Sequence, residues 1–321
     1  MDRRLFLAAG AAVASAGLPG WAQSYPDRPI KIIQGFAPGG NADAIARLVG
    51  GEMGKALGQS IVVESLAGAG GTIAAAAVAR AKPDGYTLSL ATGGHVVAGA
   101  LYNALPYQTV GSFEMVSTIT YFPFLIVTSA DSKFKSFRDV IAAAGGAPGT
   151  VAYGTAGIGS THHLAGELLA RMAGVQMMHV PYRGDSASLT ALLAGDVPFI
   201  IAPPTAVLSN IKAGKLRALA TTGPQRWPGL LDVPTVGEQG VAGYDVRSWA
   251  GLLAPAGTPR AIIDQLNAEV LKTLQIPAVK TRLEDIGGEA RGSTPEEMKA
   301  MVAAELSRWT QVVAEARIPK Q

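Results

Sequence analysis

The sequence contains no cysteine among its 321 residues. This absence excludes disulfide bonds, thiolate metal sites and a cysteine nucleophile. Charged residues make up only 16% of the chain and the formal net charge is +3. No basic run with interleaved aromatic residues accompanies that small charge, so the composition argues against a nucleic-acid partner. A chain of this length can bury a large core or form two domains, and its stability must come from that core.

No run of apolar residues is long enough to span a bilayer comfortably, and the nearest candidate lies at the N-terminus. Arg3 and Arg4 precede an apolar segment over 5–18, and small residues follow up to Ala22. This order is typical of an export signal, which we expect at residues 1–22 with cleavage after about Ala22. The paired arginines also resemble a twin-arginine signal, with ordinary secretory export as the alternative. The mature protein is therefore expected to be exported.

The stretch 30–57 organises the rest of the chain. Residues 30–36, IKIIQGF, are β-branched and apolar, which predicts a buried parallel strand. Pro38, Gly39 and Gly40 end that strand, and apolar residues at helical spacing follow. The pattern predicts a turn with bare backbone N–H groups at a helix N-terminus. Such a turn binds an anion without a cationic side chain, although a tight turn whose glycines serve only packing is an equal alternative.

The same unit of strand, turn and helix recurs along the chain. Strands at 61–64 and 86–91 are each followed by a glycine-rich turn and a helix, which predicts a parallel sheet. Two extended runs within 113–128 have no helix between them, so the chain leaves this sheet there. Strands and helices alternate again over 136–221, and an extended run at 246–254 leads back to the first unit. Three further helices are expected over 260–274, 278–286 and 295–316.

This order predicts an α/β protein of two domains joined by two crossover connections. The first domain comprises residues 23–124 and 247–321, and the second comprises 125–246. Two connections between two domains form a hinge, so we expect a central cleft between them.

Four glycine-rich turns stand at the ends of predicted strands, at 38–43, 68–72, 92–95 and 157–161. Three belong to the first domain and one to the second, so we expect them to face each other across the cleft. Their donors are backbone amides and small side chains with little cationic character, which suits a carboxylate held by hydrogen bonds. Besides the backbone around Gly93, the polar candidates are Asn41, Thr72, Thr92, Thr155, Ser160 and Thr161.

Catalytic motifs are less well matched. The turn at 157–161 lacks the Gly-x-Ser-x-Gly pattern of a nucleophile elbow, and nothing places a base beside Ser160. No Gly-Lys-Ser/Thr follows the glycine-rich turns, and a dinucleotide fingerprint beginning at Gly68 breaks at its third glycine. We therefore expect neither enzymatic activity nor a cofactor. An exported hydrolase or lyase that uses Ser160 and His162 is the alternative.

The histidines do not indicate a metal site. His162 and His163 are adjacent, which splays their rings apart on a helix, and His95 and His179 are distant in sequence. We expect His162 at a helix N-terminus near the cleft, and His163 and His179 either at the surface or behind the cleft residues. Asp43 is expected to serve the first helical turn, with the ordering of a ligand-bridging water as the alternative.

Several stretches resemble the Bug family of periplasmic solute receptors, which serve tripartite tricarboxylate transporters. They cover essentially the whole mature chain: YPDRPIKIIQGFAPGGNAD, IVVESLAGAGGTIAAAAVARAKPDGYTL, GSTHHLAGELLARMAGVQMMHVPYRG and GKLRALATTGPQRWPGLLDVPTVGEQG. The resemblance implies a type II-like periplasmic-binding-protein fold that closes on an organic acid, commonly with bound waters. It places the carboxylate contact on Phe36, Ala37, Pro38, Gly39, Gly40 and Asp43. It places the opposing contacts on Thr155, Gly159, Ser160 and His162.

The chain also departs from the family pattern. Asn41-Ala42 stands where members often have Ser-Thr, so a hydroxyl is lost and an amide is gained. An aspartate that is common after the second-domain strand is replaced in Ala202-Pro203-Pro204. These departures predict a ligand with one firmly held carboxylate and a less polar remainder, such as an aromatic group.

Together, these features predict a monomeric periplasmic receptor without a nucleic-acid partner. It captures a small carboxylate in the interdomain cleft and delivers it to the membrane permease subunits of a tripartite transporter. A receptor that only senses the ligand and signals to a membrane kinase is the alternative.

Overall fold

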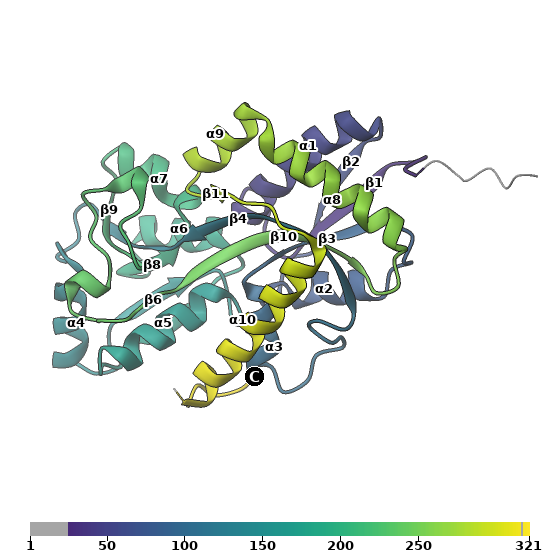
Figure 1. Cartoon of the computed structure of the whole chain (residues 1–321). Helices are drawn as coiled ribbons and strands as arrows, with labels where there is room; N and C mark the ends of the chain where they lie inside the picture. The colour runs from purple at the N-terminus through teal and green to yellow at the C-terminus, as the bar shows by residue number, and fades with distance from the viewer. Residues whose placement is uncertain (1–24, 316) are drawn as a thin grey trace, which may run out of the picture.

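The computed structural model describes residues 25–315 and 317–321, so the expected export signal lies outside the described residues. Figure 1 shows two α/β units side by side, each built around one sheet. The first sheet has the order β11 (Glu289–Ala290), β4 (Phe113–Pro123), β10 (Arg247–Pro255), β3 (Thr87–Thr92), β1 (Ile30–Gln34) and β2 (Ile61–Ser65). The second has the order β7 (Met178–Pro181), β6 (Ala152–Thr155), β8 (Phe199–Ala202), β5 (Leu125–Ser129) and β9 (Leu216–Thr221).

The repeated units at the start of the chain form the parallel part of the first sheet. Ile32 of β1 pairs with Val63 of β2 on one side and with Leu88 of β3 on the other, and both pairings are parallel. Next to them, β10 runs antiparallel to both β3 and β4. The expected α/β fold class is confirmed.

Helices cover the faces of both sheets. The helices that belong to the first unit are α1 (Asn41–Leu57), α2 (Thr72–Ala79), α3 (Gly94–Leu101), α8 (Arg260–Gln275), α9 (Pro277–Asp285) and α10 (Pro295–Glu315). Those between the strands of the second sheet are α4 (Phe137–Gly146), α5 (Thr161–Met172), α6 (Asp185–Ala194) and α7 (Pro204–Lys212). The C-terminal helix α10 packs on α3 and β4, so the end of the chain returns to the first unit (Figure 1).

The chain crosses between the sheets twice, and the two crossings lie against each other. Strand β4 ends at Pro123 and β5 begins at Leu125, as the two adjoining extended runs predicted. Thr222, fully buried, joins this crossing to the return path: the Phe124 amide donates to its Oγ1 at 2.8 Å, and Oγ1 donates to the Val246 carbonyl at 2.6 Å. Figure 1 shows β4 and β10 leading together from one sheet towards the other. These paired crossings are suited to act as a hinge.

One large hydrophobic core runs through both units. It includes Ile32 and Ile45 in the first unit and Ile126 and Ile201 in the second. Neighbouring residues of β5 and β8 point the other way into a smaller core, because successive side chains in a strand alternate between faces. Both faces of the second sheet are therefore covered.

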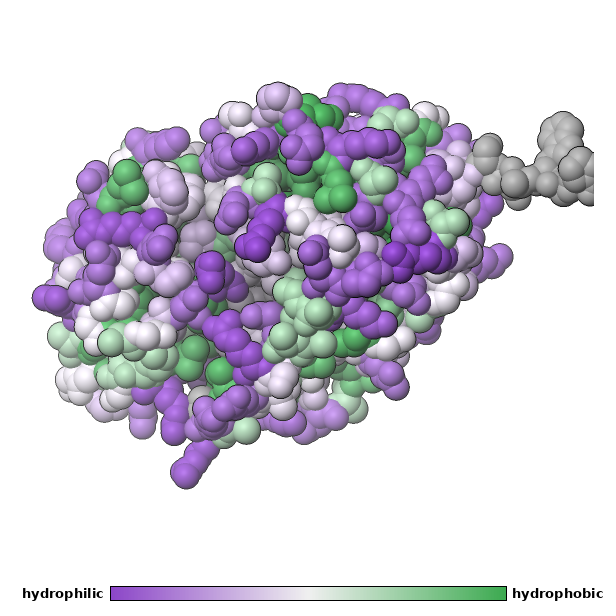
Figure 2. All heavy atoms as spheres, in the orientation of Figure 1, coloured by the Kyte–Doolittle hydropathy of each residue, from purple (hydrophilic) through white to green (hydrophobic). Residues whose placement is uncertain are grey.

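The surface is polar with scattered apolar residues. On the face in Figure 2, hydrophilic side chains surround small, separated hydrophobic patches. No helix in the described part of the chain combines the length and apolar character needed to cross a membrane.

Helix α10 begins with a capping box, as the Thr294-Pro295-Glu296-Glu297 sequence predicts. The Glu297 amide donates to Thr294 Oγ1 at 3.1 Å, and the Thr294 amide donates to Glu297 Oε2 at 2.9 Å. We expect Thr294→Ala to lower the free energy of unfolding by about 1 kcal/mol, because a helix N-terminal amide loses its partner. Urea denaturation measures the change. Thr310→Ala on the same helix is the control, and an equal effect of both substitutions would contradict the capping role.

Candidate functional site

The turn after β1 is held by side chains of the turn itself. Gln34 Oε1 accepts the Phe36 amide at 2.7 Å and its Nε2 donates to the Phe36 carbonyl at 2.8 Å. These bonds bend the chain, so the strand expected to reach residue 36 ends at Gln34. The Gly39 amide donates to Asp43 Oδ2 at 3.1 Å. The expectation of bare amides is therefore wrong for Phe36 and Gly39, because neighbouring side chains satisfy them.

Asp43 has one engaged oxygen and one free oxygen. Its Oδ2 accepts from the Gly39 amide and from Arg47 Nε at 2.9 Å. Burial raises the pKa of Asp43, but the hydrogen bonds from Arg47 and Gly39 outweigh it and hold that pKa below its usual value. Its Oδ1 is buried and has no hydrogen-bond partner. The expected role in the first helical turn is thus present, and one oxygen remains available.

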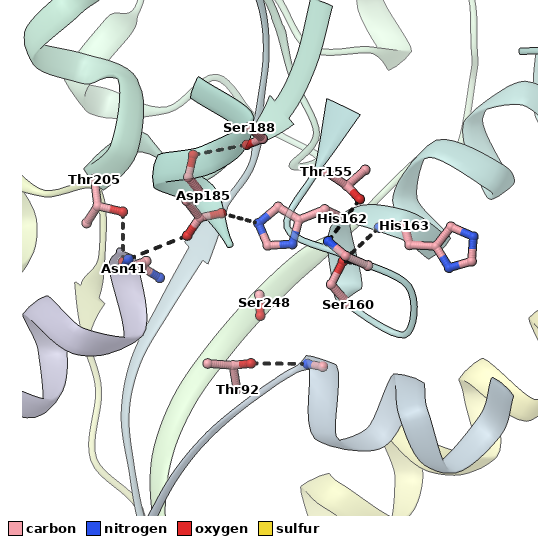
Figure 3. A network of polar contacts seen from close by, with 12 residues as sticks. Asn41, Thr92, Thr155, Ser160, His162, His163, Asp185, Ser188, Thr205 and Ser248 are labelled. Atoms are coloured by element: carbon pink, nitrogen blue, oxygen red, sulfur yellow. Dashed lines mark hydrogen bonds and ion pairs between the residues drawn. The ribbon is translucent and has the colours of Figure 1, made fainter. Parts of the chain in front are cut away.

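A small cavity of about 20 Å³ lies where the two units meet. Figure 3 shows some of the residues that line it, among them Asn41, His162 and Asp185. The volume of the cavity suits about one water molecule, so an organic acid enters only when the units move apart. Five of the predicted site residues line it, and five further residues complete the wall. The lining comprises Phe36, Asn41, Thr92, Thr161 and His162, together with Ala42, Phe122, Asp185, Pro203 and Ser248.

Four helices direct their N-termini at this cavity. The lining includes the first residues of α1, α5 and α6, which are Asn41, Thr161 and Asp185, and the residue before α7, Pro203. A helix N-terminus carries a partial positive charge and unpaired amides. Among the described residues that form the wall there is no lysine or arginine. The positive potential that would hold an anion here comes from the backbone.

Asp185 and His162 form a buried pair in the cavity wall. His162 Nε2 lies 3.1 Å from Asp185 Oδ1, but the two groups are not aligned for a hydrogen bond. Neither atom therefore has a hydrogen-bond partner. Asp185 Oδ2 is 3.5 Å from the Asn41 amide at the start of α1. His162 Nδ1 and Thr161 Oγ1 are also buried without partners. The wall therefore presents several unused hydrogen-bonding atoms to the cavity.

At two glycines, the backbone of one unit lies directly against the backbone of the other. A Cβ on Gly70 would lie 2.6 Å from the Ile158 carbonyl oxygen, and one on Gly184 would lie 3.2 Å from the Ala37 amide nitrogen. The turns at 68–72 and 157–161 thus meet across the cleft. On the outer side of this contact lies a groove of about 360 Å³, whose lining includes Phe36, Tyr102, Tyr182 and Arg183. Phe36 lines both the small cavity and this groove.

Several predicted residues lie outside the cavity wall. Thr72 lines a neighbouring cavity, beside Gly35 and His95. Thr155 is fully buried, where its Oγ1 contacts His179 Nε2 at 2.6 Å. Ala37, Pro38, Gly39 and Gly40 form the turn, Gly93 precedes α3, and Gly159 lies at the contact with Gly70.

Ser160 is the N-cap residue of α5. Its Oγ donates to the Gly157 carbonyl at 2.6 Å and accepts from the His163 amide at 3.3 Å. The neighbouring His162 ring instead lies against Asp185 and the ring of Phe124, with centroids 4.3 Å apart. The hydroxyl of Ser160 is therefore engaged in capping and is fully buried, which does not favour the hydrolase alternative.

The other histidines lie behind the cleft rather than at the surface. His163 stacks on His179 with ring centroids 4.1 Å apart, and burial lowers the pKa of His163 to about 4. Burial, with the nearby His163 and His162, lowers the pKa of His179 to about 3. His95 Nε2 donates to the Thr109 carbonyl at 2.8 Å, and burial lowers the pKa of His95 to about 4. Within residues 25–315 and 317–321, no three metal-ligating side chains gather as a metal site.

The sequence analysis missed Asp185 and Ser248. Asp185 follows Gly184, which turns the chain between β7 and α6 with a φ of 111°. This is a fifth strand–glycine–helix turn, and the same pattern that selected the other four could have found it. Ser248 lies within the strand β10, where no local motif marks it. Its pairing with Phe122 of β4 and the hydrogen bond from the Gly93 amide bring it to the cavity.

The fold and the cleft define a binding protein of two α/β units. Residues 45–318 match the family described as the tripartite tricarboxylate transporter family receptor. The chain belongs to this family, whose members are periplasmic solute-binding receptors of the Bug type. It is 35% identical to Protein BugT of Bordetella pertussis, over 97% of each chain.

Solved structures support the same assignment. Rpa4515 of R. palustris, solved with adipate, superposes with a TM-score of 0.89 at 35% identity, over 92% of this chain and all of that one. MatC of Rhodopseudomonas palustris, solved with bound malate, gives a TM-score of 0.86 at 35% identity, over 90% of this chain and all of that one. Both similar structures were solved with a carboxylate.

Proposed function

We propose that this chain captures a small organic acid in the cleft between its two units and delivers it to the permease subunits of a tripartite tricarboxylate-type transporter. In this proposal the first domain comprises residues 23–124 and 247–321, and the second comprises residues 125–246. The observation that carries the proposal is the cavity on which four helix N-termini converge. Buried, unpartnered polar atoms wall it, and the described residues of that wall include no lysine or arginine. Such a site favours an anion held by dipoles and hydrogen bonds.

The ligand class follows from the chemistry of the wall. Two relatives were solved with the carboxylates adipate and malate, which supports a carboxylate ligand for this chain. Here Phe36, Phe122 and Pro203 contribute apolar surface to the cavity. They support a ligand with one firmly held carboxylate and a less polar remainder, including an aromatic one.

The mature chain, cleaved after about Ala22 and tested as purified, provides the direct test. Native mass spectrometry detects a retained small acid, and a thermal-shift panel of carboxylic acids detects binding, because a ligand specific to the folded state stabilises it by RT ln(1 + [L]/Kd). A shift with one acid, absent with its methyl ester, supports the receptor function. A flat panel without a retained mass contradicts it, and tight citrate binding without any monocarboxylate contradicts the less polar remainder.

Delivery to a permease has its own test. Deleting the gene should abolish uptake of the acid that binds in vitro, and the chain supplied in trans should restore it. Uptake that continues unchanged without the chain would contradict the transport role.

Thr92 is expected to be a direct carboxylate contact. Its Oγ1 accepts from the Gly94 amide at 3.3 Å, so its hydrogen can be donated to a ligand. Thr92→Val should weaken carboxylate binding by about tenfold, since one hydrogen bond to a charged group is lost. Isothermal titration measures the loss. Thr72→Val, in the neighbouring cavity, is the matched control, and equal losses in both variants would contradict a direct contact.

A further inference from the structure

Asp185 is an acidic residue in the wall of the cavity that we propose as the ligand site. It is 6% exposed and lies at the first position of α6, with its carboxylate directed across the cleft towards α1 (Figure 3). Its Oδ2 contact with the Asn41 amide is long, at 3.5 Å, and its Oδ1 has no aligned hydrogen bond. A buried carboxylate that lacks partners is costly, so a donor is expected to reach it.

The protein itself does not supply that donor as a cation. The described residues of the cavity wall include no lysine or arginine, and Arg183 lines the outer groove instead. Arg47 is engaged with Asp43 and its side chain is 57% exposed. Asp185 therefore faces His162 and the helix N-termini. A second carboxylate of a ligand placed beside Asp185 is repelled, whereas a hydroxyl or ammonium group is attracted.

The opposite wall has the complementary polarity. Thr92 Oγ1 accepts from the Gly94 amide at 3.3 Å, and Ser248 Oγ accepts from the Gly93 amide at 3.2 Å. Because their oxygens accept these amides, both hydroxyls have a hydrogen to donate; that of Ser248 meets the Trp249 carbonyl only at 3.5 Å. One wall thus donates to a carboxylate, and the other accepts from a donor.

We propose that Asp185 is a specificity-determining residue that binds a hydrogen-bond donor, a hydroxyl or ammonium group, which the ligand carries close to its carboxylate. The inference rests on the proposed function as a carboxylate receptor and adds the substituent that the receptor selects. His162 acts as a positioning residue, because its Nε2 lies 3.1 Å from the carboxylate oxygen that faces the donor. Because Thr92, Ser248 and Asp185 line the same small cavity, we expect the donor and the carboxylate to be close neighbours in the ligand.

Isothermal titration of the mature chain with matched acids tests the proposal. Three sets differ only at the carbon beside one carboxylate: propionate, lactate and alanine; succinate, malate and aspartate; 3-phenylpropionate, phenyllactate and phenylalanine. In at least one set, the acid with the donor should bind at least tenfold more tightly than the acid without it. The hydroxyl and ammonium members identify which donor is selected.

Asp185→Asn should reduce that preference by at least tenfold, while binding of the unsubstituted acid stays the same or improves. Asp264→Asn on the surface of α8 is the control, and its preference should equal that of the wild type. If Asp185→Asn does not fold, Asp185→Ser gives the same comparison, and the wild-type ratios remain a test by themselves.

Two results would overturn the inference in different ways. Equal or tighter binding of the unsubstituted acids in every set shows that no donor is selected, and leaves the receptor function standing. Equal preferences in Asp185→Asn and the wild type show that another residue selects the donor. Binding of no acid in any set contradicts the proposed function, and the inference fails with it.

Discussion

Gly70→Ala is expected to weaken ligand binding at least tenfold while costing little more stability than an ordinary substitution of this kind. Gly70 has a φ of 63°, and a Cβ there would lie 2.6 Å from the Ile158 carbonyl oxygen and 2.7 Å from the Gly159 carbonyl carbon. Both atoms belong to the backbone of the opposite unit, which cannot move aside as a flexible side chain can. The substitution therefore penalises the closed arrangement, and a ligand bound between the units loses the same free energy.

Gly58→Ala separates closure from backbone strain. Gly58 has nearly the same φ, 65°, but a Cβ there meets nothing within 4 Å. Both variants should lose about 1 kcal/mol of unfolding free energy, the cost of a left-handed conformation for alanine. Only Gly70→Ala should lose affinity in isothermal titration. Equal affinities for the two variants would show that the contact between the units does not accompany binding.

Acid should destabilise the protein through its buried histidines. The pKa values of His95 and His163 fall to about 4 and that of His179 to about 3, in each case mainly because burial disfavours the charged ring. In the unfolded chain these groups titrate near 6.5, so below that pH the unfolded state binds more protons than the folded state. Stability is complete above about pH 6.5 and is lost as the pH falls towards 4. Each histidine contributes a slope of at most about 1.4 kcal/mol per pH unit.

Urea denaturation between pH 4.5 and 8 measures this slope, and His95→Gln tests its origin. His95 packs against Tyr107 and Phe113 and bonds to the Thr109 carbonyl, so the variant should be less stable at pH 8. Its stability should nevertheless fall less steeply below pH 6.5, because one group no longer takes up a proton on unfolding. Parallel pH profiles for the variant and the wild type would exclude His95 as a contributor.

The pH dependence from these histidines disappears well above pH 6.5. At about pH 8 these three histidines are neutral in both the folded and the unfolded state, so they contribute almost no slope there. His163 and His179 lie behind the cleft in the second unit, where their stacked rings and the contact of His179 with Thr155 support strand β6. His95 packs in the first unit against Tyr107 and Phe113. The role of these histidines is therefore in the architecture that supports the cavity wall.

Local pattern predicted most of the elements well. The helix face with Ile45, Val49 and Met53 is buried, and the cap at Thr294 is present. The adjoining runs at 113–128 did separate into one strand of each sheet. These features depend on neighbours within a few residues, so the sequence carries them directly.

Side-chain partners were harder to predict. The amides of Phe36 and Gly39 were expected to be bare, but Gln34 and Asp43 reach them through a bend that periodicity does not describe. Asp185 was missed although its Gly184 turn repeats the local pattern. Ser248 had no local signal at all.

The sequence by itself determined the strand–turn–helix units, the two crossings between sheets and the glycine-rich turns at strand ends, because spacing and backbone preference act locally. The tertiary structure alone decided which groups face one another: Asp185 against Asn41, Gly70 against Ile158, and Ser248 against Gly93. These pairs are separated by 144, 88 and 155 positions. Their contact depends on how two sheets close on each other, and no local periodicity encodes that geometry.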